Sequence, residues 1–409
     1  MQLKKRRSIR KALAAATCTL LSSPGHSASA KNEPLWDAAF SSLYYSETDR
    51  ITVSENAASA RKQIRDEEFV TVKIITDTMT GASPNGAAPA SDVQSFTAPS
   101  GGTTVIAPGD TPLADFSDAR VGVDTEWERP FNLSTTANYG ASVSVEKDYT
   151  SLGASAVFRR DVNQRLTTIT AGVAADFDSV DAVGGIPYEL QDTASTERKS
   201  GDSKVTLNLL GGVTRIINRR TIAQLNYTIT DSSGYLTDPY KIVSIMDAAV
   251  NPDGNHSNLG YIFESRPDNR LMQSLYFKIL HQIKDDVVTL SYRYYWDDWD
   301  IASSTFDLRY RYEIPGDYYL QPHVRFYTQS AAGFYRLMLL DTEVIPEFVS
   351  ADYRLGKLDS ATAGLKLGGR LRDDLEFGIR AEYLRQEDRA GEFQSLDAVI
   401  LQGSISYIF

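Results

Sequence analysis

The last segment of the chain, DAVILQGSISYIF (residues 397–409), shows the pattern that decides the fold. Successive side chains of a β-strand point to opposite sides, so alternate residues share a face. One face of this segment is apolar and carries Val399, Leu401, Gly403, Ile405, Tyr407 and Phe409. The other face is mostly polar and carries Ile400, Gln402, Ser404 and Ser406. The pattern predicts a strand with its apolar face in apolar surroundings.

The same alternation recurs along most of the chain. It marks sixteen segments, centred near residues 42, 55, 72, 124, 139, 154, 170, 210, 225, 277, 291, 307, 323, 365, 380 and 403. An even number of antiparallel strands is typical of a closed single-chain barrel in a bacterial outer membrane. We therefore predict an all-β transmembrane antiparallel barrel of sixteen strands. Fourteen strands are the alternative if the first two are not formed, and eighteen if the segment around residues 242–250 also pairs.

The connections between these segments fall into two kinds that alternate along the chain. One kind is short: residues 63–67, 129–132, 161–164, 218–220, 285–286, 315–317 and 372–374. The other kind includes four long segments: residues 79–118, 178–202, 231–270 and 330–359. Short periplasmic turns and long extracellular loops are typical of outer-membrane barrels. A soluble β-sandwich would also alternate, but it fits less well with so many strands and with aromatic residues gathered at strand ends.

The first 30 residues are predicted to be a signal peptide that is cleaved near Ala30. A basic start is followed by the short apolar stretch Ala12 to Leu21 and by the small residues Ala28-Ser29-Ala30. Residues 31–409 would then form a single barrel domain in the bacterial outer membrane. This part has 36 Lys plus Arg, six fewer than the whole chain, against 53 Asp plus Glu, a net charge of −17. Such a charge argues against nucleic acid as a partner.

Proline provides a second check on the strands, because it cannot donate to a sheet ladder. Of the prolines after residue 30, only Pro322 falls inside a predicted strand. The strand around residue 323 is thus the one exception to this rule among the predicted strands.

The sequence contains little that supports catalysis. The one cysteine, Cys18, lies in the signal segment, and the histidines that follow it in the barrel domain are His256, His281 and His323. His256 stands in a loop, where a polar turn explains it without catalysis, and we predict no enzyme, no catalytic residue and no cofactor. Two acidic stretches, 297–300 and 251–255, have oxygen donors of the kind that bind calcium, but neither has the full spacing of a calcium loop. We therefore assign no metal site.

Charged residues on the inward faces of the strands indicate a function. In each strand, the residues that alternate with the apolar ones should face the barrel interior. This parity rule places one group of basic residues inward on the later strands: Lys278, Arg293, Arg309, Arg311, Arg325, Lys366, Arg370 and Arg380. It places three acidic residues inward on one earlier strand: Asp124, Glu126 and Glu128. We interpret these residues as the lining of a pore for a small hydrophilic or anionic solute. The alternative is a non-conducting scaffold for a surface partner or a redox-associated partner.

The residue strings DTMTGASPNG (77–86) and KDYTSLG (147–153) resemble the DUF3570 family. The resemblance implies an exported bacterial outer-membrane protein of unassigned function, often with flavin-transferase and thioredoxin-like genes nearby. The C-terminal strand ending at Phe409 resembles the strands that the outer-membrane assembly machinery recognises. Lipid and lipopolysaccharide are the other expected partners.

The connection 79–118 contains five prolines, five glycines and no Lys or Arg. A loop of this length is usually functional or disordered. We expect it to fold into the barrel mouth, with Asp92, Asp110 and Asp115 facing the basic wall. An outward loop that shields the surface is the alternative.

Overall fold

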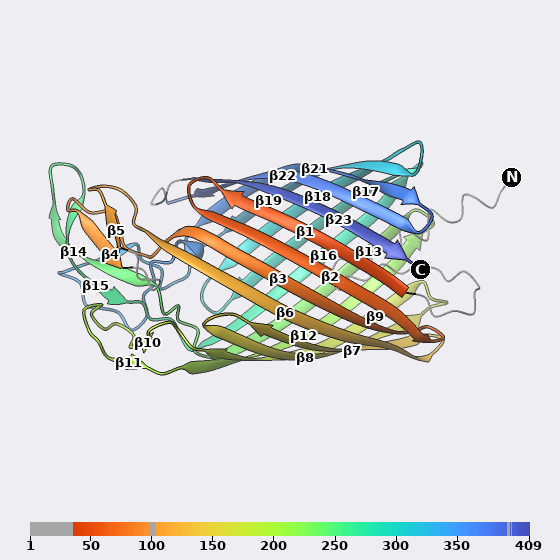
Figure 1. Cartoon of the computed structure of the whole chain (residues 1–409), viewed down its shortest axis with the longest axis horizontal. Helices are drawn as coiled ribbons and strands as arrows, with labels where there is room; N and C mark the ends of the chain where they lie inside the picture. Colours follow the sequence, from red (N-terminus) through yellow and green to blue (C-terminus); the bar gives the residue numbers. More distant parts are fainter. Residues whose placement is uncertain (1–35, 98–102, 391–392, 394) are drawn as a thin grey trace.

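A computed structural model describes residues 36–97, 103–390, 393 and 395–409 of the chain (Figure 1). Sixteen of its strands form one closed antiparallel barrel, and each predicted centre falls inside one of them. In ring order these strands are β1 (Trp36–Glu47), β2 (Ile51–Arg65), β3 (Glu68–Pro84), β6 (Leu113–Asn132), β7 (Thr135–Val145), β8 (Tyr149–Val162), β9 (Thr167–Val180), β12 (Asp202–Asn218), β13 (Thr221–Gly234), β16 (Asn269–Ile283), β17 (Asp286–Asp297), β18 (Ala302–Ile314), β19 (Tyr318–Gln329), β21 (Leu358–Arg372), β22 (Leu375–Asp388) and β23 (Leu396–Ile408). The predicted fold class and strand number are confirmed.

The first and last strands close the ring. β1 pairs with β23 in an unbroken register, from Asp37 opposite Ile408 to Glu47 opposite Ala398. At the seam, the Trp36 amide donates to the Phe409 carbonyl at 2.8 Å, and the Phe409 amide donates to the Trp36 carbonyl at 2.9 Å. Closure leaves no free sheet edge along the wall, which is the condition for β-structure to exist in lipid.

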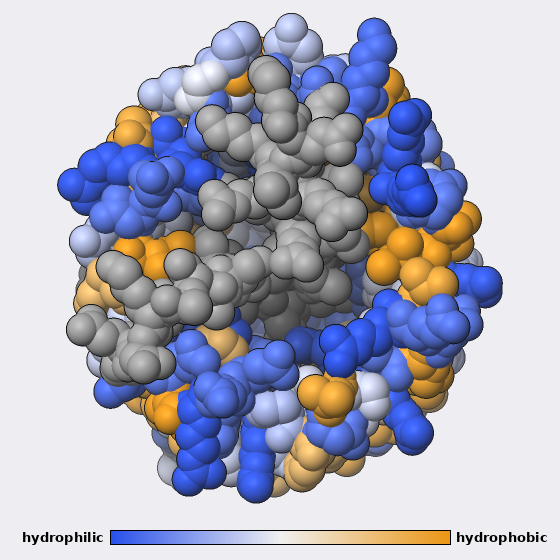
Figure 2. Space-filling model, turned by 90° about the vertical axis from the view of Figure 1, so that its right-hand side faces the viewer, coloured by the Kyte–Doolittle hydropathy of each residue, from blue (hydrophilic) through white to orange (hydrophobic). Residues whose placement is uncertain are grey.

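The outer face of the wall is apolar. In β23, Val399, Leu401, Ile405 and Tyr407 are all exposed, while Gln402, Ser404 and the other residues of the opposite face are more covered. Aromatic residues collect near the end that carries both termini, where Tyr139 contacts both Trp127 and Phe158, and Tyr407 stacks on Phe409. Viewed from that end, the rim is largely hydrophilic and hydrophobic residues appear at the circumference (Figure 2). An apolar band with aromatic residues at its border is the surface that a bilayer requires.

Several strands run further than the sequence pattern indicates. β3 continues to Pro84 and β6 begins at Leu113, so the connection between them is residues 85–112. Pro130 also lies inside a strand, β6, where the pairing register shifts between Pro130 and Asn132. The expectation that Pro322 alone lies in a strand is therefore wrong. Pro322 points outward from β19, since its neighbour His323 faces the interior and is buried.

The four long connections pack together beyond one end of the barrel, opposite the termini (Figure 1). We call their described part, residues 85–97, 103–112, 181–201, 235–268 and 330–357, the cap. It contains the hairpin β4 (Gln94–Thr97) and β5 (Thr103–Ile106), the hairpin β10 (Ile186–Pro187) and β11 (Arg198–Lys199), and a three-stranded sheet of β14 (Ile242–Val250), β15 (His256–Phe263) and β20 (Met338–Leu340). The segment 242–250 thus pairs within the cap, and the eighteen-strand alternative is wrong.

The cap has hydrophobic clusters of its own. Val243, Ile262, Leu339 and Val349 are buried together, and they come from the third and fourth connections. The connection 85–112 packs Ala88 and Ala90 against Met246 of β14, and Phe96 against Tyr261 of β15. Its hairpin lies with the cap and away from the barrel (Figure 1). The prediction that this loop folds into the barrel mouth is wrong, because its apolar residues find partners on the other loops.

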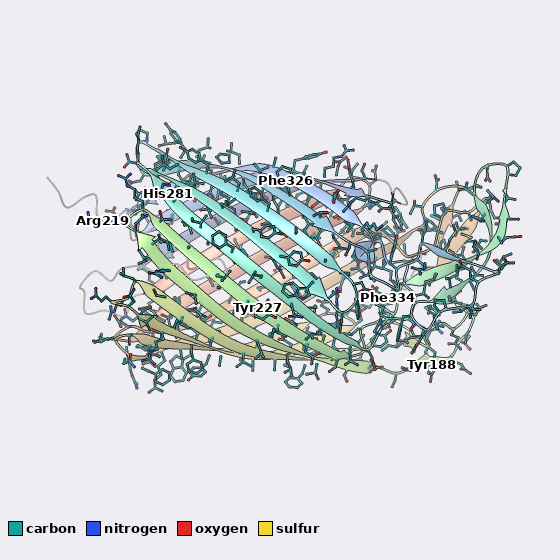
Figure 3. All side chains as sticks on the ribbon, turned by 180° about the vertical axis from the view of Figure 1, so that it is seen from behind. Tyr188, Arg219, Tyr227, His281, Phe326 and Phe334 are labelled. Carbon is teal, nitrogen blue, oxygen red and sulfur yellow. The ribbon has the colours of Figure 1, made fainter. Side chains whose placement is uncertain are left out.

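Helical structure in the described residues is limited to one 3-10 turn, Tyr353–Leu355. None of the helices there is long and apolar enough to cross a membrane. In the view from the opposite side, His281 and Arg219 lie at the end with the termini, whereas Phe334 and Tyr188 lie at the cap end (Figure 3).

Candidate functional site: a charged barrel lumen

The barrel interior has two walls of unlike charge. In the ring of sixteen strands, β6 is the fourth and β18 is the twelfth, so they stand eight places apart on opposite sides. The eight predicted basic residues lie on the inner faces of β16 to β22, and Asp124, Glu126 and Glu128 lie on the inner face of β6. The ring order therefore brings the basic residues together on one side and places the acidic residues across from them.

The basic wall is built round a histidine between two carboxylates. His323 Nδ1 lies 2.7 Å from Glu382 Oε1, and His323 Nε2 lies 2.8 Å from Asp307 Oδ2. Carboxylates only accept hydrogen bonds, so a ring that carries a proton on each nitrogen satisfies both contacts. Arg325 and Arg309 also contact Asp307, at 2.8 and 3.2 Å. These contacts hold the charged groups in fixed positions relative to one another. The Arg325 side chain nevertheless remains nearly half exposed to the lumen.

Gly364 makes this arrangement possible. It lies on β21 directly between His323 on β19 and Glu382 on β22, in register with both. A Cβ at position 364 would come within 2.2 Å of Glu382 Cγ. The histidine and the glutamate therefore meet across a strand that has no side chain at that position.

The remaining basic residues are supported in different ways. Arg311 pairs with Glu313 at 2.6 Å and stacks on Tyr319, which also lies 5.7 Å from the Lys366 ammonium. Arg370 lies 3.8 Å from both Asp373 and Glu376, and Arg380 lies 3.8 Å from Glu382. Lys278 is buried and has an interaction partner. Arg293 is exposed to the lumen, and its described contact is with the ring of Tyr295.

The acidic wall is only partly neutralised. Glu128 pairs with Arg61 of β2 at 3.0 Å, and Glu126 accepts a hydrogen bond from Asn138 of β7. Asp124 stands opposite Lys73 in the register of β3 and β6. The facing walls thus keep opposite signs, which sets up an electric field across the lumen.

A second charged group, which the sequence analysis missed, lies where the cap meets the barrel. Arg266 contacts Glu264 at 2.7 Å and Asp352 at 3.0 Å, and Arg354 contacts Asp352 at 2.6 Å. Burial raises the pKa of Glu264 to about 7, although Arg266 opposes this shift. Burial by itself also raises the pKa of Asp352, but the hydrogen bonds and charge of Arg354 outweigh it and lower the pKa overall. These residues stand in segments without strand periodicity, so parity does not detect them.

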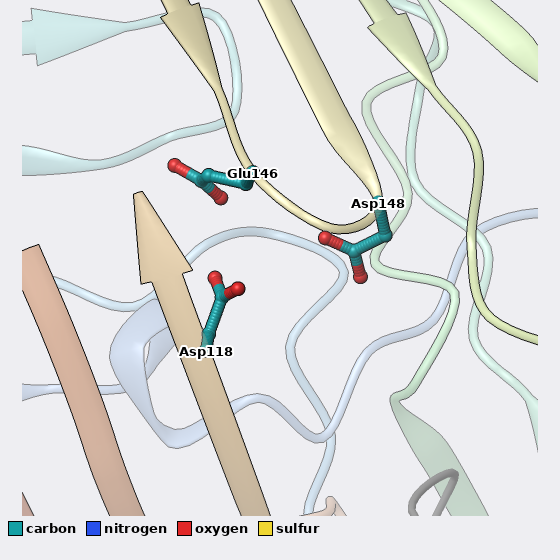
Figure 4. A group of neighbouring side chains, drawn as sticks. All are labelled: Asp118, Glu146 and Asp148. Atoms are coloured by element: carbon teal, nitrogen blue, oxygen red, sulfur yellow. The ribbon is translucent and has the colours of Figure 1, made fainter. Parts of the chain in front are cut away.

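Three carboxylates meet at the cap end of β6 and β7: Asp118, Glu146 and Asp148 (Figure 4). Arg120 lies 4.0 Å from Glu146, and the Tyr240 hydroxyl donates to Asp148 at 2.6 Å. These contacts partly satisfy the three carboxylates, which are half-buried.

The acidic stretches noted in the sequence serve as hydrogen-bond acceptors within the protein. Asp297 accepts from Arg270 at 2.5 Å and from the Tyr295 hydroxyl at 2.7 Å. Asp253 accepts from the Ser91 hydroxyl at 3.0 Å. Both carboxylates therefore have structural roles that explain them.

The other two histidines also have local partners. His256 Nδ1 lies 2.7 Å from the Asp247 carbonyl, and His281 Nδ1 lies 2.9 Å from the Thr221 hydroxyl. His281 is exposed on the outer face, at the end with the termini. No serine or acid beside His256 gives it the arrangement of a catalytic base within the described residues.

The closed wall, its apolar outer face and its charged interior define a transmembrane β-barrel of the outer-membrane type. The chain belongs to the family described as "Protein of unknown function (DUF3570)", which it matches over residues 10–407. The family resemblance is thereby confirmed. A comparison with curated proteins gives no match.

Solved outer-membrane barrels are similar in outline only. A bacterial polysaccharide outer membrane secretin has 8% identity and a TM-score of 0.47, with 93% of this chain and 100% of the other covered. Pseudomonas aeruginosa OpdK with vanillate has 9% identity and a TM-score of 0.41, with 92% and 99% covered. The ferric enterobactin receptor PfeA of the same organism has 9% identity and a TM-score of 0.44, with 86% of this chain covered. The chain spans about half the length of that receptor, 53%.

Proposed function

We propose that this protein is a pore of the bacterial outer membrane for small hydrophilic solutes, with anions following the basic wall. The cap would face the cell exterior and the short turns the periplasm. The observation that carries the proposal is the lumen itself, with a basic wall on β16 to β22 facing an acidic wall on β6. Sixteen strands about 4.8 Å apart and tilted by about 40° give a backbone radius of roughly 16 Å, which wall side chains alone do not fill.

Charge placement supports a pore more than a purely braced barrel. Arg293 and Lys366 face the lumen without a carboxylate partner within the described residues. A structure that used charge only to hold its walls together would pair these cations. Unpaired cations along the wall of a water-filled lumen attract anions and lower the energy barrier to their passage.

The test is ion selectivity in planar bilayers. We expect discrete conductance steps from the wild-type protein. Replacing two unpaired cations, Arg293→Gln with Lys366→Gln, leaves no carboxylate without its partner and should shift the anion-to-cation permeability ratio several-fold toward cations. Replacing Asp124 with Asn on the opposite wall should shift the ratio the other way. No conductance from heat-modifiable, folded protein would reject the pore.

The cap supports a second candidate function. It is a folded body with buried clusters of its own, and it extends beyond the barrel rim. A non-conducting scaffold that presents the cap to a surface or redox-associated partner would have this form. Electrical silence, both in the intact protein and after shortening of the cap, favours the scaffold over the pore.

A further inference from the structure

A cavity of about 420 Å³ lies between the cap and the barrel wall at the cap end of the lumen. One side is the cap segment that contains Asp352, Arg354 and Leu355, and the other side is the inner face of β16 to β19. Four guanidinium groups reach it: Arg266, Arg270, Arg293 and Arg354. Its size is in the range of small-molecule sites in proteins.

The four guanidinium groups are not equally available. Arg266 and Arg354 are both engaged by Asp352, and each has another carboxylate, Glu264 at 2.7 Å and Asp238 at 3.2 Å respectively. The carboxylates around these two cations already balance their charge. They therefore fix the cap side of the cavity and leave binding to the barrel side.

Arg270 is held in place with part of its guanidinium free. Its Nε and Nη2 donate to one oxygen of Asp297, at 2.9 and 2.5 Å, and its guanidinium lies 4.3 Å from the centre of the Trp299 ring. Nη1 has no hydrogen bond to any described residue. A guanidinium fixed in this way loses little freedom when it binds a ligand, which favours affinity.

Arg293 is the more available cation. It faces the lumen from β17, and its described contact is with the ring of Tyr295, at 5.9 Å. It has no ion pair or hydrogen bond with another residue in the parts of the chain that the structure describes. Its planar fork of donors matches a carboxylate, which accepts two such bonds side by side.

The uncharged lining completes the selectivity. Thr305, directly opposite Arg293 in the β17–β18 register, offers a hydroxyl group. Ile301 and Leu355 are buried apolar residues on the same cavity, and both belong to one hydrophobic cluster with Trp299. The cavity therefore combines a cationic subsite, which can bind an anion, with an apolar surface a short distance away.

We propose that this cavity binds a small organic monocarboxylate, with the carboxylate between Arg293 and Nη1 of Arg270 and the apolar part against Ile301 and Leu355. This inference rests on the proposed pore in one respect: it names the class of solute that the pore recognises at its cap end. The binding itself does not depend on conduction. The two ideas can therefore fail separately.

The test uses the full-length protein in lipid nanodiscs and isothermal titration calorimetry. The probes are butyrate and its neutral analogue butyramide, which has nearly the same shape. We expect butyrate to bind and butyramide to bind at least tenfold more weakly, since a hydrogen bond to a charged group contributes roughly a factor of 10 to 100. Arg293→Gln should weaken butyrate binding by roughly tenfold or more.

Two further variants make the result specific. Arg385→Gln removes an arginine that pairs with Glu387 on the outer face of the barrel and should leave butyrate binding unchanged. Thr305→Val removes the hydroxyl group and should weaken binding less than Arg293→Gln does. Heat-modifiable migration on gels checks that each variant is folded. If the Arg293→Gln protein does not fold, Thr305→Val still tests the same site.

Equal binding of butyrate and butyramide, or unchanged butyrate binding by folded Arg293→Gln protein, would overturn the inference. Arginine-dependent binding in a protein that is silent in bilayers would support the subsite and reject the pore. Conductance without any butyrate binding would support the proposed pore and reject the proposed carboxylate subsite.

Discussion

The barrel wall and the cap place apolar and charged residues in opposite ways. In the wall, Leu401 and Ile405 point outward, and charged groups such as Arg325 point into the lumen. In the cap, Val243 and Val349 are fully buried, and an ionic group including Glu264 and Asp352 is buried beside them. The wall thus exposes its apolar residues and the cap buries them, because the two parts face different surroundings: lipid outside the wall and water outside the cap.

Because of this difference, we expect ion pairs to contribute most to stability in the cap, where water is excluded from them. Removing one partner of a buried pair leaves the other charge uncompensated, which costs about 3–5 kcal/mol. An exposed pair contributes about 0–1 kcal/mol.

Asp352→Asn should open the cap and leave the barrel closed. Asp352 is 1% exposed and is the shared partner of Arg266 and Arg354, so its loss should destabilise the cap by about 3–5 kcal/mol. Hydrogen exchange of the cap amides measures the change. Glu387→Gln, at an exposed ion pair with Arg385, is the matched control and should change exchange very little. Wild-type protection of the cap in Asp352→Asn protein would contradict the burial argument.

Leu401→Arg and Ile400→Arg should differ strongly although the residues are neighbours. Leu401 faces outward from the middle of β23, whereas Ile400 faces the lumen. An arginine on the lipid face near mid-membrane costs about 2–4 kcal/mol, whereas one in an aqueous lumen costs much less. Urea unfolding of the two variants in lipid vesicles gives the comparison. Similar losses of stability for both would contradict the assignment of the outer face to lipid.

Removing residues 91–108 should leave single-channel conductance close to the wild-type value. The Gly109 amide donates to the Ala90 carbonyl at 2.8 Å, so the two ends can be joined with little strain. The described part of this loop packs on the cap, on Met246 and Tyr261, and away from the lumen. Planar bilayer recordings test the prediction, and a clear rise in conductance would mean that the loop narrows the pore after all.

The sequence determined the wall. Period-2 alternation, the alternation of short and long connections and the avoidance of proline are local properties, so they predict sixteen strands and the inward side of Arg309, Arg325 and Asp124 without any contact being known. Strand ends were less well predicted, because β3 and β6 continue their pairing beyond the apolar pattern to Pro84 and Leu113.

Which charges meet and where the long loops pack depends on the tertiary structure. His323 bonds to Glu382 across Gly364, and Arg270 and Arg293 share a cavity with cap residues 352–355. These contacts join strands and loops far apart in sequence, and closure of the ring and packing of the cap set their geometry. Alternation depends on each residue and its immediate neighbours, whereas a binding site depends on the positions of residues that only the closed barrel brings together.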